Sequence, residues 1–408
     1  TSNLGLGTGA VDAITTGDYN VGVGDGALTA TTSGANNTGM GYYALAANTT
    51  GSTNTAIGDR ALRYNTTASN NTAVGYYALL QNTTGSSNVA VGDLALTDNT
   101  TGGSNVAVGK GSLGANTTGA NNTAIGHNAL YANTTGVENI AVGRQALESN
   151  TTGYENVVMG RGAAQEITTG VRNVALGDMA MGAATTTDRS ISIGHNTGGS
   201  SGVMTGNDNI SMGYFAGRQL TSGQNNVLIG SSAGTAINTG AQNISIGYNT
   251  NPSAANDSYS IIISTDQDSG KGSSTAFIAP NGGGVYQDNN TTTWSTVSDR
   301  RIKKNIEDNT TGLEVINQIR VRNFEYRTED EIVDFENPKS GVVNKEGTQL
   351  GVIAQEIELI LPNIVKQEST GVKSVNPDNL TWYLVNAIKE LSTKNDALVA
   401  RLIALENA

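Results

Sequence analysis

A glycine recurs at every seventeenth position of this chain from Gly7 to Gly247, and one 19-residue step interrupts the period. Self-similarity at a fixed period is typical of repeat architectures, in which each copy packs only on its neighbours. We call these fifteen residues the register glycines: Gly7, Gly24, Gly41, Gly58, Gly75, Gly92, Gly109, Gly126, Gly143, Gly160, Gly177, Gly194, Gly213, Gly230 and Gly247. The chain must therefore stack many copies of one small unit.

The residues before each register glycine follow a fixed pattern. Position −1 is Leu, Val, Ile or Met in every copy, position −3 is Thr, Val, Ile or Leu, and position −2 is small in most copies. This alternation predicts a short β-strand with positions −1 and −3 on one face. Position −4 is Asn in fourteen copies, Ser190 being the exception. Stacked copies would place Asn over Asn in a hydrogen-bonded ladder.

The repeats predict a mainly β fold, in which residues 1–250 form a parallel β-roll or β-solenoid shaft of fifteen copies. Because so short a repeat cannot enclose much of a core, we expect several chains, three in a fibre, to share it. The seven Asn-Thr-Thr sequences between residues 48 and 150 match glycosylation acceptors, but turn chemistry that recurs with the repeat explains them better. The residue pattern of these repeats resembles the Asn-x-Ala-Ile-Gly-x-x-Ala repeats of trimeric adhesin heads and phage tail-fibre shafts. This resemblance implies a homotrimer of parallel β-rolls.

Composition excludes several functions. The chain has no cysteine, so disulfides and thiolate chemistry are excluded, and its net charge of −12 argues against nucleic acid as a partner. No apolar run approaches the roughly 20 residues of a membrane span, and we expect no membrane insertion. The first residues already lie inside a repeat, so we expect the natural N-terminus, and with it an attachment region, to lie elsewhere.

The position after each register glycine varies freely, as expected of a surface position. Both histidines, His127 and His195, lie there four repeats apart, too far to share a metal ion, and we expect no metal and no cofactor. A symmetric site built from three copies of one His is the alternative. The aromatic pairs Tyr42–Tyr43, Tyr76–Tyr77 and Tyr214–Phe215 are either sugar platforms or aromatics that cover the edges of the repeats. No carboxylate pair suggests glycoside cleavage.

A change in charge density marks a second region. Residues 298–408 contain 14 Lys and Arg and 18 Asp and Glu, which leaves only 9 and 17 for residues 1–297. Between the two regions, residues 251–297 leave the period and form an expected β-rich connector. Within it, residues 258–265 and 275–280 have the composition of strands.

Two sequence blocks characterise the C-terminal region: "WSTVSDRRIKKNI" from residue 294, and "QLGVIAQEIELILPNIV" over 349–365. They resemble the intramolecular chaperone domain of phage endosialidase tailspikes, a self-cleaving serine peptidase. The resemblance implies that Ser298 is the nucleophile, that Lys303 is its base, and that the cut falls between Val297 and Ser298. The neighbouring cations Arg300, Arg301 and Lys304 would favour a neutral Lys303, the form that acts as a base. An ordinary basic surface cluster beside a serine is the alternative.

Residues 381–408 predict a coiled-coil helix. Its apolar seam follows the 4–3 spacing of heptads: Leu384, Ile388, Leu391, Asn395, Leu398, Leu402 and Leu405. The single polar member, Asn395, would set register and oligomeric state at some cost in stability. The seam alone does not choose between a dimer and a trimer.

Together these features predict a viral, phage-type tail fibre or tailspike that attaches the virion to a host cell-surface receptor, for which a glycan is one candidate. Its C-terminal domain would direct trimerisation and then remove itself by one autocleavage, with no external peptide substrate. A trimeric cell-surface adhesin and a glycan-degrading tailspike are the alternatives.

Overall fold

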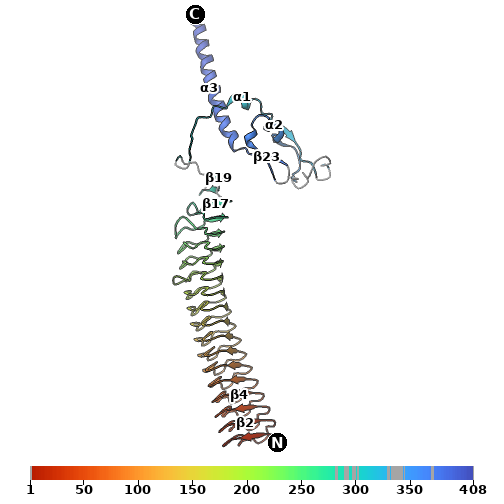
Figure 1. The fold of residues 1–408 in the computed structure, drawn as a ribbon, viewed down its shortest axis with the longest axis vertical. Helices are drawn as coiled ribbons and strands as arrows, with labels where there is room; N and C mark the ends of the chain where they lie inside the picture. Colours follow the sequence, from red (N-terminus) through yellow and green to blue (C-terminus); the bar gives the residue numbers. More distant parts are fainter. Residues whose placement is uncertain are drawn as a thin grey trace. The chain divides into compact units, whose positions relative to one another are not determined.

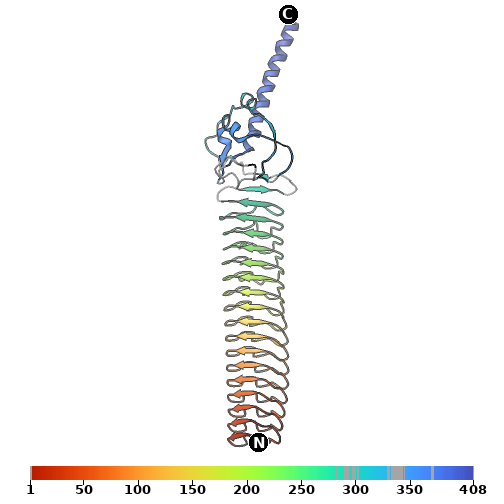
Figure 2. The same cartoon turned by 90° about the vertical axis from the view of Figure 1, so that its right-hand side faces the viewer.

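The computed structural model describes residues 2–280, 284–288, 294–295, 300, 303–328, 331, 343, 345–368 and 372–407. The chain divides into two compact units, Thr1–Val297 and Ser298–Ala408. The first unit is a β-solenoid, and the second combines short helices and strands with one long helix (Figures 1 and 2).

Each repeat forms one coil of the solenoid, with a three-residue strand that ends directly before the register glycine. The fifteen strands are β1 (Leu4–Leu6), β2 (Val21–Val23), β3 (Thr38–Met40), β4 (Thr55–Ile57), β5 (Thr72–Val74), β6 (Val89–Val91), β7 (Val106–Val108), β8 (Thr123–Ile125), β9 (Ile140–Val142), β10 (Val157–Met159), β11 (Val174–Leu176), β12 (Ile191–Ile193), β13 (Ile210–Met212), β14 (Val227–Ile229) and β15 (Ile244–Ile246). Neighbouring strands pair in parallel, residue to equivalent residue, as Thr55 pairs with Thr72. The predicted parallel solenoid of 17-residue repeats is confirmed.

The parallel pairing continues beyond residue 250. Strands β16 (Ile261–Ser264) and β17 (Ala276–Ala279) add to the same sheet, as the composition of 258–265 and 275–280 predicted. After β17 the direction changes, because β18 (Val285–Gln287) and β19 (Trp294–Ser295) pair antiparallel. An antiparallel hairpin therefore covers the last parallel strand, which protects a sheet edge that would otherwise invite further pairing.

A single chain encloses the core of the solenoid. The small residue at position −2, such as Ala56 or Ala73, points inward and is fully buried. The residues at positions +3 and +4 join it, and the Leu column at +4 has no solvent exposure: Leu28, Leu45, Leu62, Leu79, Leu96, Leu113, Leu130 and Leu147. The expectation that these coils need sister chains to form a core is therefore wrong. Stacking alone suffices, because the Leu residues of successive coils belong to one buried cluster that runs along the shaft.

Left-handed backbone conformations form the corners of each coil. In the coil of Gly58, Thr53, Arg60 and Leu62 have φ angles of 60°, 52° and 53°, and the glycine itself has a φ of 136°. A left-handed residue with a side chain costs about 1–2 kcal/mol. Here the backbone N–H of Thr53, Arg60 and Leu62 donates to carbonyls of adjacent coils, at 2.9, 2.7 and 3.0 Å. The corners thus direct these donors along the stacking axis, where they find acceptors.

The predicted Asn ladder is present at position −4. Asn37 receives the backbone N–H of Asn54 on its Oδ1 at 3.0 Å, and its own Nδ2 donates to the carbonyl of Gly51 at 2.9 Å. The same bonds recur from Asn20 to Asn173, and these side chains are fully buried. The ladder therefore satisfies polar groups that the narrow interior would otherwise leave without partners.

A second ladder consists of the Asn residues of the Asn-Thr-Thr sequences. In this ladder Asn65 Nδ2 donates to Asn48 Oδ1 at 2.9 Å and to the carbonyl of Ala68 at 2.9 Å. All seven members are fully buried, so in the folded shaft none can accept a glycan: Asn48, Asn65, Asn82, Asn99, Asn116, Asn133 and Asn150. The ladder ends where Ile167 takes the next place, and the Oδ1 of Asn150 has no partner among the described residues.

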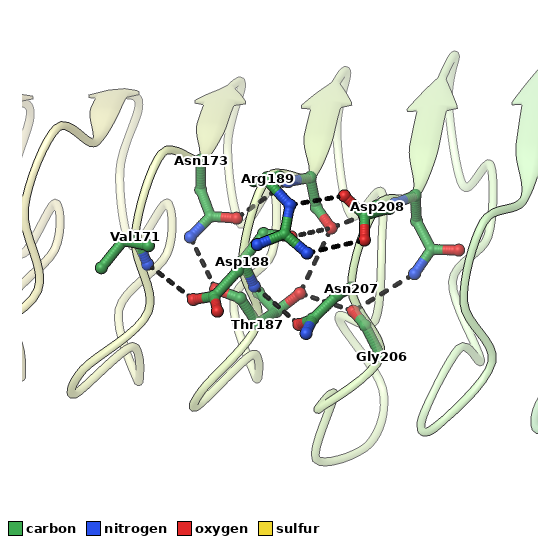
Figure 3. Close-up of polar contacts among 10 residues, drawn as sticks. Val171, Asn173, Thr187, Asp188, Arg189, Gly206, Asn207 and Asp208 are labelled. Atoms are coloured by element: carbon green, nitrogen blue, oxygen red, sulfur yellow. Dashed lines mark hydrogen bonds and ion pairs between the residues drawn. The ribbon is translucent and has the colours of Figure 1, made fainter.

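The ladder at position −4 passes through the 19-residue step (Figure 3). Ser190, which replaces Asn, donates its N–H to Asn173 Oδ1 at 3.0 Å and accepts the N–H of Asn209 on its hydroxyl at 3.2 Å. On the surface, Arg189 forms a two-point ion pair with Asp208 of the next coil, at 2.8 Å for both bonds. This contact lowers the pKa of Asp208 below its usual range. The longer coil is thus joined to both neighbours.

The second unit is built from short elements and one long helix. They are α1 (Leu313–Ile316), β20 (Arg322–Phe324), β21 (Gln349–Gly351), α2 (Ala354–Glu358), the 3-10 helix η4 (Pro362–Ile364), β22 (Val365–Gln367), β23 (Lys373–Val375) and α3 (Asp378–Glu406). Strands β20 and β21 form one antiparallel pair, and β22 and β23 form another. Helices α2, η4 and α3 supply the buried core, so sequentially distant segments meet around the first turns of α3.

We predict that Gly92→Ala destabilises the shaft by roughly 3 kcal/mol. Gly92 has a φ of 142°, and a Cβ there would lie 2.5 Å from the carbonyl oxygen of Gly109, which belongs to the backbone and cannot move aside. Denaturant unfolding of the full chain, followed by circular dichroism, measures the change. The control is Gly103→Ser, because the equivalent position in the two preceding coils is Ser69 and Ser86. Equal midpoints for Gly92→Ala and the parent chain would contradict the backbone-contact argument.

Candidate functional site

The residues expected to carry out autocleavage are only partly described. Val297 and Ser298, the two sides of the expected cut, lie outside the described residues, as does Arg301. Lys303 is described and exposed, and its backbone N–H donates to the carbonyl of Arg300 at 3.2 Å. The pairing of Ser298 with Lys303 therefore stays a prediction from the sequence.

The second sequence block, residues 349–365, forms the centre of the C-terminal unit. It supplies strand β21, helix α2 and the start of β22. Its apolar residues Ile357, Leu361 and Ile364 are buried and pack with Tyr383 of α3. Burying these side chains contributes roughly 2 kcal/mol each. The block is therefore the structural core that holds α3 to the rest of the unit.

One ion pair joins this block to the preceding strand. Arg322 of β20 contacts the carboxylate of Glu356 in α2 through two bonds, at 2.6 and 3.3 Å. The hydrogen bond from Arg322 is the main cause of a pKa of Glu356 below its ordinary value of 4.5, and it raises the pKa of Arg322. The pair fixes the orientation of α2 relative to the β20–β21 ribbon, since a two-point contact restrains both side chains.

Helix α3 has two different halves. Its first turns belong to the unit, since Asn386 Nδ2 donates to the carbonyl of Asn309 at 2.8 Å and Glu390 accepts the N–H of Leu313 at 3.2 Å. From Leu391 to Asn407 every residue is exposed. The six apolar members of the predicted seam are all exposed: Leu384, Ile388, Leu391, Leu398, Leu402 and Leu405. Asn395, the polar member, is exposed as well. The helix is present, whereas the coiled coil itself stays a prediction.

The solenoid presents an apolar outer face that the sequence pattern had not assigned to a surface. Positions −1 and −3 of each strand point outward, opposite to the buried position −2. They line one side of the sheet with half-exposed aliphatic side chains, as in Met40 (42% exposed), Ile125 (40%) and Ile229 (37%). A contiguous apolar strip of this kind marks an interaction surface in most proteins. The sequence feature that could have revealed this face is the aliphatic residue found at position −1 in every repeat.

The aromatic pairs of the shaft cluster with cations. Tyr76 and Tyr77 stack with ring centroids 3.9 Å apart, and the Arg60 guanidinium lies over Tyr77 at 5.4 Å and over Tyr42 at 5.3 Å. A second cluster joins His195, Tyr214 and Phe215, with Arg218 over the Phe215 ring at 4.5 Å. These rings already use several of their faces on one another and on arginine side chains. Such contacts stabilise the surface of neighbouring coils.

Within the described ranges, no group of three or more His, Asp or Glu side chains is arranged to hold a metal ion. His195 lies 3.5 Å from Asp178 on the shaft surface. In the described part of the chain, no helix combines the length and the apolar character needed to cross a bilayer.

A repetitive β-solenoid followed in the sequence by a small non-repetitive unit fits a fibre-type protein. Comparison with known families agrees for the C-terminal part. Residues 298–366 match the family model Peptidase_S74, the chaperone of endosialidase. This region is therefore an endosialidase-type chaperone domain, as its two sequence blocks predicted, and the chain resembles phage tail-fibre proteins. No curated protein and no solved structure matches the chain significantly.

We predict that the C-terminal unit loosens in acid through the Arg322–Glu356 pair. A folded-state pKa below the ordinary value means that the pair stabilises the fold above about pH 4.5, and that this contribution is lost as pH falls through the folded-state pKa. Glu356→Gln should therefore lower the protection of the unit's backbone amides from hydrogen exchange at pH 7. The further loss of protection toward pH 3 should be smaller in this variant than in the parent chain. Hydrogen exchange of residues 345–368 in the full chain measures both effects. Glu314→Gln, at an exposed position of α1, is the control, and a parallel response of both variants would contradict the assignment.

Proposed function

We propose that this chain is part of a phage tail fibre or tailspike, in which the C-terminal unit assembles three chains and then cuts itself off between Val297 and Ser298. The observation that carries the proposal is the chaperone-of-endosialidase match at residues 298–366, directly after a β-solenoid. The released shaft would remain in the virion and serve attachment to a host cell surface.

The need for a guide follows from the repeats. Fifteen similar coils can pair with sister chains out of step by one repeat at little cost, because side chains of the same type then meet. Such misaligned states trap a folding chain. A non-repetitive unit at one end removes the ambiguity, since it aligns the chains before the shafts dock.

Two apolar surfaces support association of three copies. One is the outer strand face of the solenoid, and the other is the seam of α3, where Leu391, Leu398 and Leu402 are 55%, 65% and 58% exposed. A short stretch of isolated helix is marginally stable in water, so partner helices would be needed to hold α3 beyond residue 390. The support for a trimer thus comes from these two outward-facing apolar surfaces. It does not come from a core shared by three chains, which was the expectation from the sequence.

The cleavage step can be written from the residues. The Ser298 Oγ attacks the carbonyl carbon of Val297, and the Lys303 amine accepts the hydroxyl proton. The C–N bond breaks, the proton passes to the departing amine of Ser298, and the acyl group is left as an ester on Oγ. Water then hydrolyses that ester and frees the shaft. A lysine acts as a base only when burial or nearby cations favour its neutral form. Because Lys303 is exposed in the single chain, we infer that assembly provides this burial and couples cleavage to trimer formation.

We predict that Ser298→Ala and Lys303→Ala each abolish processing. A denaturing gel of the purified protein should then show one full-length band, whereas the parent chain releases the fragment of residues 298–408. The matched controls are Ser295→Ala and Lys345→Ala, an exposed lysine outside the basic cluster, and both variants should cleave normally. Release of the C-terminal fragment from either dyad variant would contradict the assigned roles.

We predict that Leu391→Asp prevents trimer formation, since it places a charge in the α3 seam, where association would have to desolvate it. Light scattering of the full chain should report monomers for Leu391→Asp and trimers for the parent. The neighbouring change Ser392→Asp adds the same charge off the seam and should leave the trimer intact. A trimer that survives Leu391→Asp would show that the seam does not hold the chains together.

A further inference from the structure

One coil of the shaft has a hollow in its surface. The coil of Gly109 is the only one of the fifteen repeats with glycine at both positions +2 and +5, namely Gly111 and Gly114. Elsewhere at least one of the two positions carries a side chain, such as Arg60 and Arg63 in the coil of Gly58. The missing side chains leave a pocket with a volume of about 340 Å³. Its walls come from three successive coils: Leu94, Thr97, Asp98, Lys110, Gly111, Gly114, His127, Asn128 and Tyr131.

The two glycines also let neighbouring side chains lie across the coil. A Cβ on Gly114 would lie 2.8 Å from Cε2 of Tyr131, so the aromatic ring occupies the space above this glycine. A Cβ on Gly111 would lie 2.6 Å from Oδ1 of Asn128, whose Nδ2 is held by Glu148 at 3.1 Å. Tyr131 and Asn128 therefore lie close against the glycine floor, and a larger residue at 111 or 114 would displace them.

The lining combines a flat apolar surface with both hydrogen-bond donors and hydrogen-bond acceptors. Tyr131 is 45% exposed and Leu94 is 36% exposed, so an apolar wall remains available. The side chains of Thr97, Asp98 and Asn128 provide hydrogen-bond acceptors, and Lys110 provides donors. An apolar wall with a few polar groups at its edge is typical of small-molecule sites of this volume.

The charges of the pocket favour an uncharged ligand. Lys110 is already paired with Asp93, with the Nζ and the carboxylate oxygen 3.1 Å apart. Asp98 adds a carboxylate to the lining itself. The pocket therefore has no surplus of positive charge that would attract an anionic sugar. A pyranose ring matches this lining, because its C–H face packs on an aromatic ring while its hydroxyl groups donate and accept hydrogen bonds.

We propose that this pocket binds one uncharged pyranose unit of a cell-surface glycan, with Tyr131 as the stacking platform. The inference rests on the proposed role in host attachment, for which it names the ligand class. This pocket is distinct from the aromatic pairs Tyr42–Tyr43, Tyr76–Tyr77 and Tyr214–Phe215. The rings of those pairs lie against each other and against Arg60 or Arg218. The lining does not include the outward strand positions −1 and −3, so glycan binding and chain association would use different residues.

Saturation-transfer difference NMR on the full chain tests the proposal. The probes are the methyl glycosides of glucose, galactose, N-acetylglucosamine and N-acetylgalactosamine, with methyl N-acetylneuraminide as the charged comparison. At least one neutral glycoside should show transfer, strongest at the ring C–H protons. Tyr131→Ala should weaken its binding about tenfold, as expected for one lost stacking contact. Transfer to none of the neutral glycosides, or to the charged one alone, would overturn the proposal.

Three further variants separate the pocket from the fold. Tyr131→Phe keeps the ring and should retain binding. Gly114→Thr places in the pocket the residue that the preceding coil carries at this position, Thr97, and should block binding while circular dichroism stays unchanged. Tyr154→Ala removes an exposed tyrosine outside the pocket and should have no effect. Full binding by both Tyr131→Ala and Gly114→Thr would overturn the site. A chain that trimerises and cleaves itself but binds no neutral sugar would overturn this inference alone.

Discussion

The hydrogen bonds that run between successive coils are the constraint on which the shaft depends. Strand amides, corner amides and buried Asn side chains all find partners in an adjacent coil. These bonds are the reason that left-handed residues such as Leu62 are tolerated at every level, although each costs about 1–2 kcal/mol. A coil removed from its neighbours would keep that cost and lose its partners, so stability belongs to the stack and not to the repeat.

This constraint explains which parts of the fold could be predicted from the sequence. The period, the strand at positions −3 to −1 and the Asn ladder follow from local pattern, because each depends on residue type in one column. The self-contained core did not follow, since the Leu at position +4 becomes an inward residue only when the backbone takes a positive φ there. For the same reason the aliphatic column at −1 was not recognised as an outer face. Sequence alternation identifies two faces of a strand but does not say which one is inside.

Compensating substitutions show that the core, once known, can be followed in the sequence. In three coils that have Ala or Gly at position +4 in place of Leu, position +7, which carries the Asn of the second ladder in other coils, is large and apolar. Ala164 is accompanied by Ile167, Gly217 by Leu220, and Gly234 by Ile237. A Cβ on Gly217 would lie 2.9 Å from Leu220 and 2.8 Å from Leu228, so these leucines fill the missing volume. The packing density of the core is thus maintained, although the Asn hydrogen bond of the second ladder is lost in these coils. In the C-terminal unit the family match fixes the class of domain, but the geometry of Ser298 lies outside the described residues.

A shaft that forms its own core changes what assembly has to achieve. In the proposed trimer, sister chains would not be needed to bury the leucines. They would instead cover an outer strand face that is nearly the same in every repeat. Irregular coils give the shaft internal marks of register. The 19-residue step before Gly213 is one, since a slip of one repeat would set its longer coil against an ordinary one. That mark lies two repeats before Gly247, the last register glycine, and so within the shaft itself. A guide at the C-terminus and an irregular coil within the shaft would therefore specify register from two places, and a slipped trimer could satisfy neither.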